Sequence, residues 1–434
     1  MTSLLLYAIL AADTAPEIIS YEGKLSQMER GKPTVAVKEF SAQSAIQPAG
    51  TAYEAITLVT ETASQLPWAE QLSRQSNVQA AQRPVAIGYR HDERMYVIPA
   101  MFPLLSSPEP LREGLKWTVD SASFEVTGQE QVGKTACWVV QSVTGPARRH
   151  QILVRTDAPI VESLRQTVFM GQGDRFELVV NRKESVTPND DDLARNAGFA
   201  TLFLDLQSQL QRDEHDRSAD LTEEQVGLAA KQSGELVAKA TGSMYERFAK
   251  DVQRAIDDRT RRADKVAELA GKFVGQSAPG FVLTRLNGDE IDLAALKGKV
   301  VILHFWGYQD EPLEQPYGQI GYLDFLANRY KDQNIAVYGV AVDPQLATPL
   351  TRDTAVRSIR RLTSFMKTSY EVTLDTKSVL TQFGNPTRLG VELPLWVVID
   401  PAGKIAHYHV GYHSIDNARG LHTLDELVQH MLKE

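Results

Sequence analysis

The sequence predicts a multi-domain protein of mixed α+β and α/β class, with an N-terminal antiparallel β domain, a helical connector and a C-terminal α/β sandwich. Three observations predict it. The chain has 434 residues, which is more than one hydrophobic core accommodates, since a typical domain has about 150 residues. Short strand-like runs fill the first part of the chain, and longer apolar runs alternate with helical segments in the last part. We expect the three parts at residues 17–188, 189–270 and 271–434.

The composition is that of a folded globular protein, with 43% hydrophobic and 23% charged residues. Lys and Arg number 46 against 55 Asp and Glu, which gives a formal net charge of −9. Because no long basic run offsets this charge, we expect no nucleic-acid partner. No apolar stretch approaches the roughly 20 residues of a membrane-spanning helix, so we expect no integral membrane segment.

The chain starts with a short apolar stretch, Leu4–Ala12. This stretch has the length of the apolar core of a secretory signal, although no Lys or Arg precedes it. We therefore treat residues 1–12 as a candidate signal peptide. It predicts a periplasmic or secreted protein, with a cytoplasmic location as the alternative.

Residues 17–188 show the alternation of apolar and polar residues that is typical of strands. Two of these runs, Val161–Phe169 and Phe176–Val180, flank Gly171-Gln-Gly-Asp174. Glycine tolerates positive φ, and no helix follows, so the pattern predicts a hairpin turn and not a phosphate loop. We expect one antiparallel sheet over the whole segment.

Residues 189–270 contain no proline and are rich in Ala and Gln, which predicts helices. One helix start is well marked, because Thr222 and Gln225 stand at the spacing of a capping box. The apolar residues of this segment follow a helical period that indicates packing. We expect it to act as a helical connector without chemistry of its own.

The last part of the chain alternates strands and helices. Val300–Phe305 and Ile335–Val342 are continuous apolar runs, typical of strands covered on both faces. A helix is predicted between them at Tyr317–Tyr330, and another at Leu421–Leu432. This order predicts a mixed sheet with helices on both sides.

Two motifs in this part resemble a known group of proteins. Ser277–Leu293, followed by Leu296–Trp306, resembles the opening of the TlpA/ResA-type and AhpC/TSA-type (redoxin) proteins. Leu393–Ile405 is similar to their later signature, in which a cis-proline precedes a strand. The resemblance implies a thioredoxin-like fold over 271–434, with Pro394 as the cis-proline, and an activity in thiol–disulfide exchange or antioxidant defence.

The sequence departs from that group where the chemistry takes place. Redox-active relatives continue from the Phe-Trp strand into Cys-x-x-Cys, at a helix N-terminus that stabilises the thiolate. Aligned on Pro312, this chain has Asp310 and Leu313 at the two thiol positions. Neither side chain can attack a disulfide sulfur. We therefore expect a degenerate CxxC and a thiol-inactive domain.

Cys137 is the only cysteine of the chain. A lone thiol excludes an internal disulfide and a Cys-rich zinc motif. Its neighbours in Ala-Cys-Trp-Val-Val favour a strand, so we expect a buried structural cysteine. The alternative is that Cys137, or the thiol of a partner, supplies the missing sulfur.

Other polar residues of the last part do not form a predicted site. His407 and His409 share one face of a strand, but no carboxylate or cysteine stands at ligand spacing, so we expect exposed histidines and neither metal nor cofactor. His413 follows them without adding a ligand pattern. Asp343 and Asp375 end two strands, where we expect them to cap loops.

The β-rich segment resembles the half-open barrels of LolA-like envelope proteins. The similarity lies in Tyr21-Glu-Gly23, Glu125–Gly128 and Val132–Val140, within a run of antiparallel strands. The resemblance implies a concave sheet that binds apolar chains, and hence a lipid ligand.

Three functions follow. The first is an exported thioredoxin-like protein without redox cysteines, which serves as a binding or structural module for a protein or lipid partner. The second is a thiol-disulfide oxidoreductase or antioxidant of the redoxin class. The third is a lipid or lipoprotein carrier centred on the N-terminal β domain. Whether the chain is an enzyme depends on whether a thiol reaches the degenerate site. The sequence names no particular ligand, partner or oligomeric state.

Overall fold

The computed structural model describes most of the chain, namely residues 15–29, 31, 33–50, 52–61, 66–77, 84–92, 94–144, 148–210, 221–307, 319–413, 415–416 and 420–433. The chain divides into two compact units, Met1–Asp257 and Asp258–Glu434. The candidate signal segment at residues 1–12 lies outside the described residues. So do Asp310 and Leu313.

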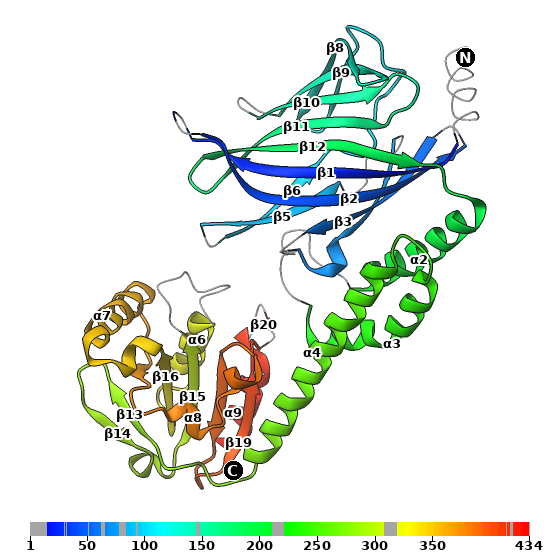
Figure 1. The fold of residues 1–434 in the computed structure, drawn as a ribbon. Helices are drawn as coiled ribbons and strands as arrows, with labels where there is room; N and C mark the ends of the chain where they lie inside the picture. The colour runs from blue at the N-terminus through cyan, green and yellow to red at the C-terminus, as the bar shows by residue number, and fades with distance from the viewer. Residues whose placement is uncertain are drawn as a thin grey trace. The chain divides into compact units, whose positions relative to one another are not determined.

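The first unit is built on a large antiparallel sheet (Figure 1). Among the described residues it has ten strands in the order β4-β3-β2-β1-β12-β11-β10-β9-β8-β7. These are β1 (Glu17–Gln27), β2 (Val35–Ala49), β3 (Ala52–Glu61), β4 (Leu72–Ser76), β7 (Lys116–Val119), β8 (Ala122–Val132), β9 (Thr135–Thr144), β10 (Arg148–Arg155), β11 (Val161–Met170) and β12 (Asp174–Val186). Pairing of β1 with β12 joins the two halves of the meander.

The predicted hairpin between β11 and β12 is confirmed. Met170 pairs with Asp174 across the turn, and Gly171 and Gly173 both have positive φ, at 59° and 111°. Glycine is required there because other residues rarely adopt these angles.

The predicted single sheet over residues 17–188 is wrong in one respect. The strands β5 (Val85–His91) and β6 (Arg94–Ala100) pair with each other as a separate two-stranded sheet. Val85, Ile87 and Ile98 are buried in the same core as the inward side chains of β1 and β12. Stacking this hairpin on the large sheet removes apolar surface of both from water.

Three helices follow the sheet: α2 (Asp190–Gln209), α3 (Glu223–Ala240) and α4 (Glu246–Phe273). The predicted capping box is confirmed, because the Gln225 backbone N–H donates to Thr222 Oγ1 at 3.2 Å and the Thr222 N–H donates to Gln225 Oε1 at 3.0 Å. Phe199, Phe203 and Phe248 pack in one cluster with Leu58 and Leu72 of the sheet. These helices therefore cover part of the face opposite the β5–β6 hairpin.

The division between the two units falls within α4, at Asp257. The first turns of α4 pack through Phe248 and Val252 in the helical cluster of the first unit. Its last turns pack through Leu269 and Phe273 on the second unit. Helix α4 thus contributes to two cores, and the three-part domain division stays a prediction.

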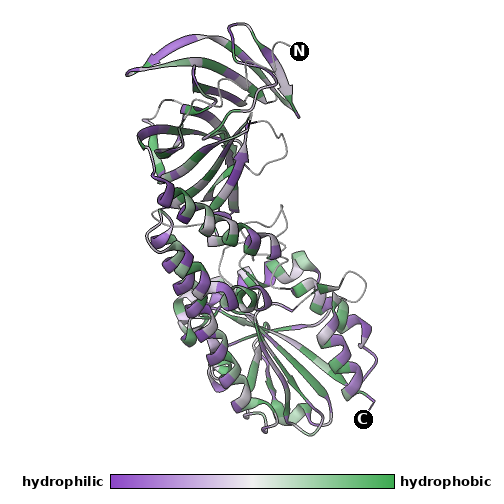
Figure 2. Cartoon of the chain, turned by 90° about the vertical axis from the view of Figure 1, so that its right-hand side faces the viewer, coloured by the Kyte–Doolittle hydropathy of each residue, from purple (hydrophilic) through white to green (hydrophobic). Residues whose placement is uncertain are grey.

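The second unit is an α/β sandwich around a mixed sheet, whose strands are mostly hydrophobic in Figure 2. In the part of the chain that the structure describes, the order is β14-β13-β17-β16-β15-β18-β19, and β15, β16 and β17 are parallel. Its strands are β13 (Val282–Arg285), β14 (Glu290–Asp292), β15 (Val300–Gly307), β16 (Ile335–Val342), β17 (Glu371–Leu374), β18 (Leu395–Ile399) and β19 (Ile405–Val410), with the short pair β20 (Ile415–Asp416) and β21 (Gly420–Leu421). Its helices are α6 (Ile320–Arg329), α7 (Pro349–Met366), α8 (Val379–Gln382) and α9 (His422–Met431).

Alternate residues of β15 enter two separate cores. Ile302 and Trp306 pack with α6, α7 and α9 on one face of the sheet. Leu303 and Phe305 pack with α8 and the end of α4 on the other face. Burial on both faces explains why β15 is a continuous apolar run.

Among the helices that the structure describes, none has the length and apolar character needed to cross a bilayer.

Candidate functional site

One edge of the second sheet brings together Pro394, Asp343 and Asp375. The parallel strands β15, β16 and β17 all end at this edge. Leu395 pairs with Phe305 in antiparallel register, so Pro394 also lies there. Open α/β sheets bind ligands outside the carboxyl ends of their strands. Residues 308–318, which include Asp310 and Leu313, follow β15 and lie outside the described residues.

Pro394 is tied to the chain that follows β19. The Leu393–Pro394 peptide bond is cis, and Pro394 is buried. Its carbonyl accepts a hydrogen bond from the Gly411 N–H at 2.7 Å. The Trp396 indole N–H donates to the Gly411 carbonyl at 3.0 Å. These bonds fix Gly411–His413 beside Pro394.

Gln319 connects this segment to the start of α6. Its side-chain amide donates to the His413 carbonyl at 2.6 Å and accepts from the His413 N–H at 3.0 Å. Gln319 is buried and has a left-handed backbone with φ of 63°. The two hydrogen bonds of this amide fix the point where the chain enters α6.

Four histidines gather beside Trp396 on the face that α6 and α9 cover. This histidine cluster consists of His304, His407, His409 and His413. The ring centroids of His304 and Trp396 are 3.9 Å apart, and those of His409 and His413 are 4.3 Å apart. The predicted exposure of His407 and His409 is wrong, since both side chains are half-buried. The reason is that the Gly411–His413 segment folds back over their face of the strand.

The histidine cluster is poor in charge. Burial lowers the pKa of His407 to about 4, with a smaller contribution from His409. Burial lowers the pKa of His413 to about 3, and the neighbouring imidazoles add to the effect. Both rings are therefore neutral at pH 7. The rings of His407, His409 and His413 stack on one another, with interplanar angles of 15°, 24° and 28°.

Asp343 and Asp375 serve as caps at the same edge, as the sequence predicts. Asp343 accepts from the Gln345 N–H at 2.7 Å. Asp375 accepts from the N–H groups of Val379 and Leu380 at 2.5 and 3.2 Å. Burial raises the pKa of Asp375, and these two bonds oppose the shift.

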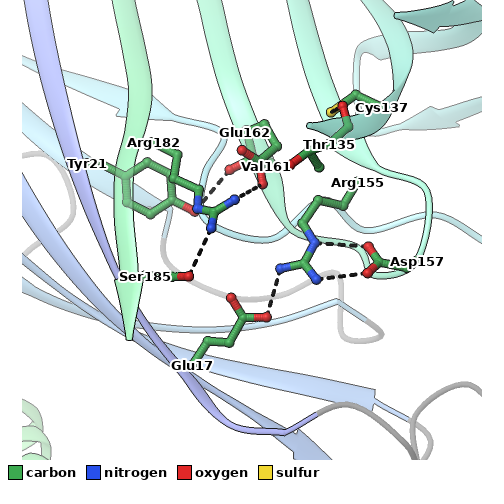
Figure 3. Close-up of polar contacts among 10 residues, drawn as sticks. All are labelled: Glu17, Tyr21, Thr135, Cys137, Arg155, Asp157, Val161, Glu162, Arg182 and Ser185. Atoms are coloured by element: carbon green, nitrogen blue, oxygen red, sulfur yellow. Dashed lines mark hydrogen bonds and ion pairs between the residues drawn. The ribbon is translucent and has the colours of Figure 1, made fainter. Parts of the chain in front are cut away.

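The lone thiol is buried in the first unit, on β9. Cys137 Sγ lies 3.8 Å from the Thr135 carbonyl, to which it donates a weak hydrogen bond (Figure 3). Burial raises its pKa to about 11, and the charge of Glu162 contributes to that rise. The thiolate is the reactive form, and Cys137 is in the protonated thiol form at neutral pH.

An ion-pair network lies near Cys137 (Figure 3). Arg155 binds Glu17 at 2.7 Å and Asp157 at 2.9 Å, and Arg182 binds Glu162 at 2.7 Å. A surface hollow of about 530 Å³ is lined by four of these residues, Glu17, Arg155, Asp157 and Arg182. Since the guanidinium groups already have carboxylate partners, the network holds the ends of these strands together.

Sequence reasoning missed Gln319 and the clustering of His304 with the later histidines. His304 is the one polar residue in an apolar run, Val300–Phe305, and a polar residue in such a run signals a specific environment. The sequence around Gln319 contains no comparable signal that would predict its buried position.

Comparison with known proteins identifies the family. A profile of the AhpC/TSA family matches residues 274–408. The thiol-disulfide oxidoreductase ResA of Bacillus subtilis (strain 168) is 32% identical over 155 residues, which cover 33% of this chain and 73% of the relative. A ResA of Bacillus cereus is 28% identical over 149 residues, which cover 34% of this chain and 75% of the relative. ResA of Bacillus anthracis is 37% identical over 70 residues, which span 16% of this chain and 39% of that protein.

Solved structures give related matches. A putative thiol:disulfide interchange protein DsbE from Chlorobium tepidum is 24% identical, with 37% of this chain and 97% of that chain covered and a TM-score of 0.28. A putative thioredoxin from Neisseria meningitidis is 26% identical, with 36% and 91% covered and a TM-score of 0.27. Together with the sheet order, the cis Leu393–Pro394 bond and the profile match, the ResA relatives show that the chain belongs to the AhpC/TSA family of thioredoxin-like proteins.

Proposed function

We propose that the second unit is a thiol-free binding module, which holds an extended segment of a partner protein at the edge formed by Pro394 and Gly411–His413. The observation that carries the proposal is the cysteine content. The only cysteine, Cys137, is buried in the other unit with a pKa of about 11. Alignment on Pro312 predicts Asp310 and Leu313 at the two thiol positions. Thiol–disulfide exchange requires a thiolate that attacks sulfur.

The Pro394 edge retains features that suit a peptide ligand. Leu393 precedes the cis-proline and offers main-chain groups of the kind that pair with an extended segment. Tyr412 is 49% exposed and Ile415 is 39% exposed beside this edge. A half-exposed aromatic ring beside strand ends is a typical anchor for a partner chain.

We propose further that the protein is exported, on the strength of the apolar stretch Leu4–Ala12. Carriage of a lipid by the first unit has less support. The apolar face of its large sheet is packed by β5 and β6, so its inward side chains already have partners.

The binding proposal is tested with the full chain and reduced, alkylated insulin B chain as the probe. Calorimetry is expected to detect saturable binding, and Tyr412→Ser is expected to weaken it about tenfold, which corresponds to about 1.4 kcal/mol. Phe365→Ser is the matched control, because Phe365 is an exposed aromatic residue on α7, at 70%. Equal affinity of the Tyr412 and Phe365 variants would show that the Pro394 edge does not bind the probe.

A further inference from the structure

Two hairpin turns of the first unit bring metal-binding side chains together. His91 and Asp92 lie where β5 turns into β6, and Asp174 lies where β11 turns into β12. His91 Nε2 is 2.8 Å from Asp174 Oδ2 and 3.6 Å from Asp92 Oδ2. Among the residues that the structure describes, this trio has its donor atoms all within 4.8 Å of one another.

The three donor atoms lie close against the backbone of Gly171. A Cβ atom on Gly171 would lie 2.7 Å from Asp92 Oδ2, 3.0 Å from Asp174 Oδ2 and 3.1 Å from His91 Nε2. These distances are shorter than ordinary contacts of a Cβ atom, so a side chain at this position would displace the donor atoms. Glycine thus allows the imidazole and the two carboxylates to approach one another at this turn.

The surroundings hold the imidazole beside the two carboxylates. The His91 ring meets the edge of Phe176 at 4.9 Å and stacks on Tyr89 at 6.3 Å. The His91 side chain is only 13% exposed, whereas Asp92 and Asp174 are 62% and 48% exposed. The Tyr96 hydroxyl accepts a hydrogen bond from the Gly171 N–H at 2.9 Å, which fixes the turn. A positioned imidazole with two solvent-accessible carboxylates leaves an open side for water.

We propose that His91, Asp92 and Asp174 form a binding site for a divalent transition-metal ion, with Zn²⁺ as the preferred class. One imidazole nitrogen and two carboxylate oxygens are ligands that Zn²⁺ accepts at about 2.0–2.2 Å, and water completes the shell. The two carboxylates balance the charge of the ion. The bound ion would tie the β5–β6 hairpin to the β11–β12 turn.

The test uses the full chain, stripped with a chelator and titrated with Zn²⁺ alone by calorimetry. The native chain is expected to bind Zn²⁺ at this site. His91→Ala and Asp174→Asn are each expected to weaken that binding at least about tenfold. Even the loss of a residue that only hydrogen-bonds to a metal ligand lowers metal affinity about 10–100-fold. Gly171→Ala is expected to weaken Zn²⁺ binding likewise, because the added Cβ would displace the three donor atoms. Gly227→Ala, on α3 with nothing within 4 Å of the added atom, is the control and is expected to bind within about twofold of the native chain.

A second control removes an ordinary imidazole–carboxylate pair. His422 Nε2 lies 3.0 Å from Glu426 Oε1 on α9, in a pair of exposed side chains. His422→Ala is expected to leave Zn²⁺ binding unchanged. Circular dichroism without metal checks that every variant is folded. The proposal is overturned if folded His91→Ala and Asp174→Asn bind like the native chain, or if only His409→Ala abolishes binding, which would place the ion in the histidine cluster.

Discussion

At the residue scale, Gly23 shows how closely the core of the first unit is packed. The Phe40 ring lies over Gly23, its partner on the neighbouring strand, so that a Cβ atom there would be 1.9 Å from Cζ of the ring. No Cβ tolerates such a distance, and the ring is held by the surrounding core. Gly23→Ala is therefore expected to destabilise the protein by about 1–3 kcal/mol, measured by urea unfolding.

The control for this substitution is Gly227→Ala, on an exposed position of α3 with nothing within 4 Å of the added atom. Replacing glycine by alanine in a helix is expected to stabilise by about 0.5–1 kcal/mol. A Gly23 variant as stable as the native chain would show that Phe40 does not occupy that space.

His413 gives the stability of the second unit a pH dependence. It is 6% exposed and faces the imidazoles of His304, His407 and His409. The unfolded chain binds a proton at this histidine near pH 6.5, whereas the folded chain does so only near pH 3. Between these values acid favours the unfolded state, so stability is retained above about pH 6.5 and falls as the pH is lowered.

Each such histidine contributes up to about 1.4 kcal/mol per pH unit within that window. His413→Asn is expected to flatten the decline in unfolding free energy between pH 6.5 and about pH 4.5, measured by denaturant titration. His422→Asn, at an exposed histidine of α9, is expected to leave it unchanged. An unchanged slope in the His413 variant would mean that this ring already binds a proton in the folded protein.

At the element scale, the segment between β15 and α6 decides whether the domain can exchange disulfides. Asp310→Cys with Leu313→Cys restores Cys-Glu-Pro-Cys before α6. The double variant is expected to form a disulfide in air, detected by mass and thiol titration.

The single variant Asp310→Cys is the control, since it has the thiol without the resolving partner. A double variant that stays reduced in air, while the single variant remains folded, would place the CxxC positions elsewhere in the chain.

The β5–β6 hairpin bears on the lipid-carrier alternative. Phe102 and Leu104, which follow the hairpin, are buried with Val85 and Ile98 against the large sheet. An acyl chain of about 10 methylenes gains about 8 kcal/mol from burial before ordering costs, and only if space is open to it. We expect no saturable binding of a fluorescent fatty acyl probe to the full chain. Saturable micromolar binding would show that the hairpin can leave the sheet, and would restore the carrier function.

Sequence patterns predicted individual strands and turns better than they predicted which strands pair and which side chains come into contact. The apolar run of β15 and the glycine turn between β11 and β12 are local signals, and both elements formed as predicted. The alternation in β5 and β6 predicts strands but not which strand each one pairs with, because pairing is set by long-range packing. His407 and His409 likewise shared a predicted face, while their contact with His413 depends on how the chain turns after β19.

At the scale of the whole molecule, the chain combines a thioredoxin-like fold with a single cysteine, which lies outside the residues that match the family. The second unit has the cis-proline, the sheet order and the capped strand ends described above. The whole chain has one cysteine. That cysteine lies in the first unit, buried and protonated at neutral pH. The central claim is therefore that the protein keeps the thioredoxin-like scaffold without its thiol chemistry.

The most direct test of this claim is the turnover of the full chain in insulin reduction and in peroxide consumption with a thiol donor, with ResA of Bacillus subtilis as the active reference. We predict rates at the level of the enzyme-free blank for the native chain and for Cys137→Ser. Turnover above the blank that Cys137→Ser abolishes would contradict the structural role of this thiol. Turnover that survives Cys137→Ser would contradict the account as a whole, because the chain would then react without any sulfhydryl group.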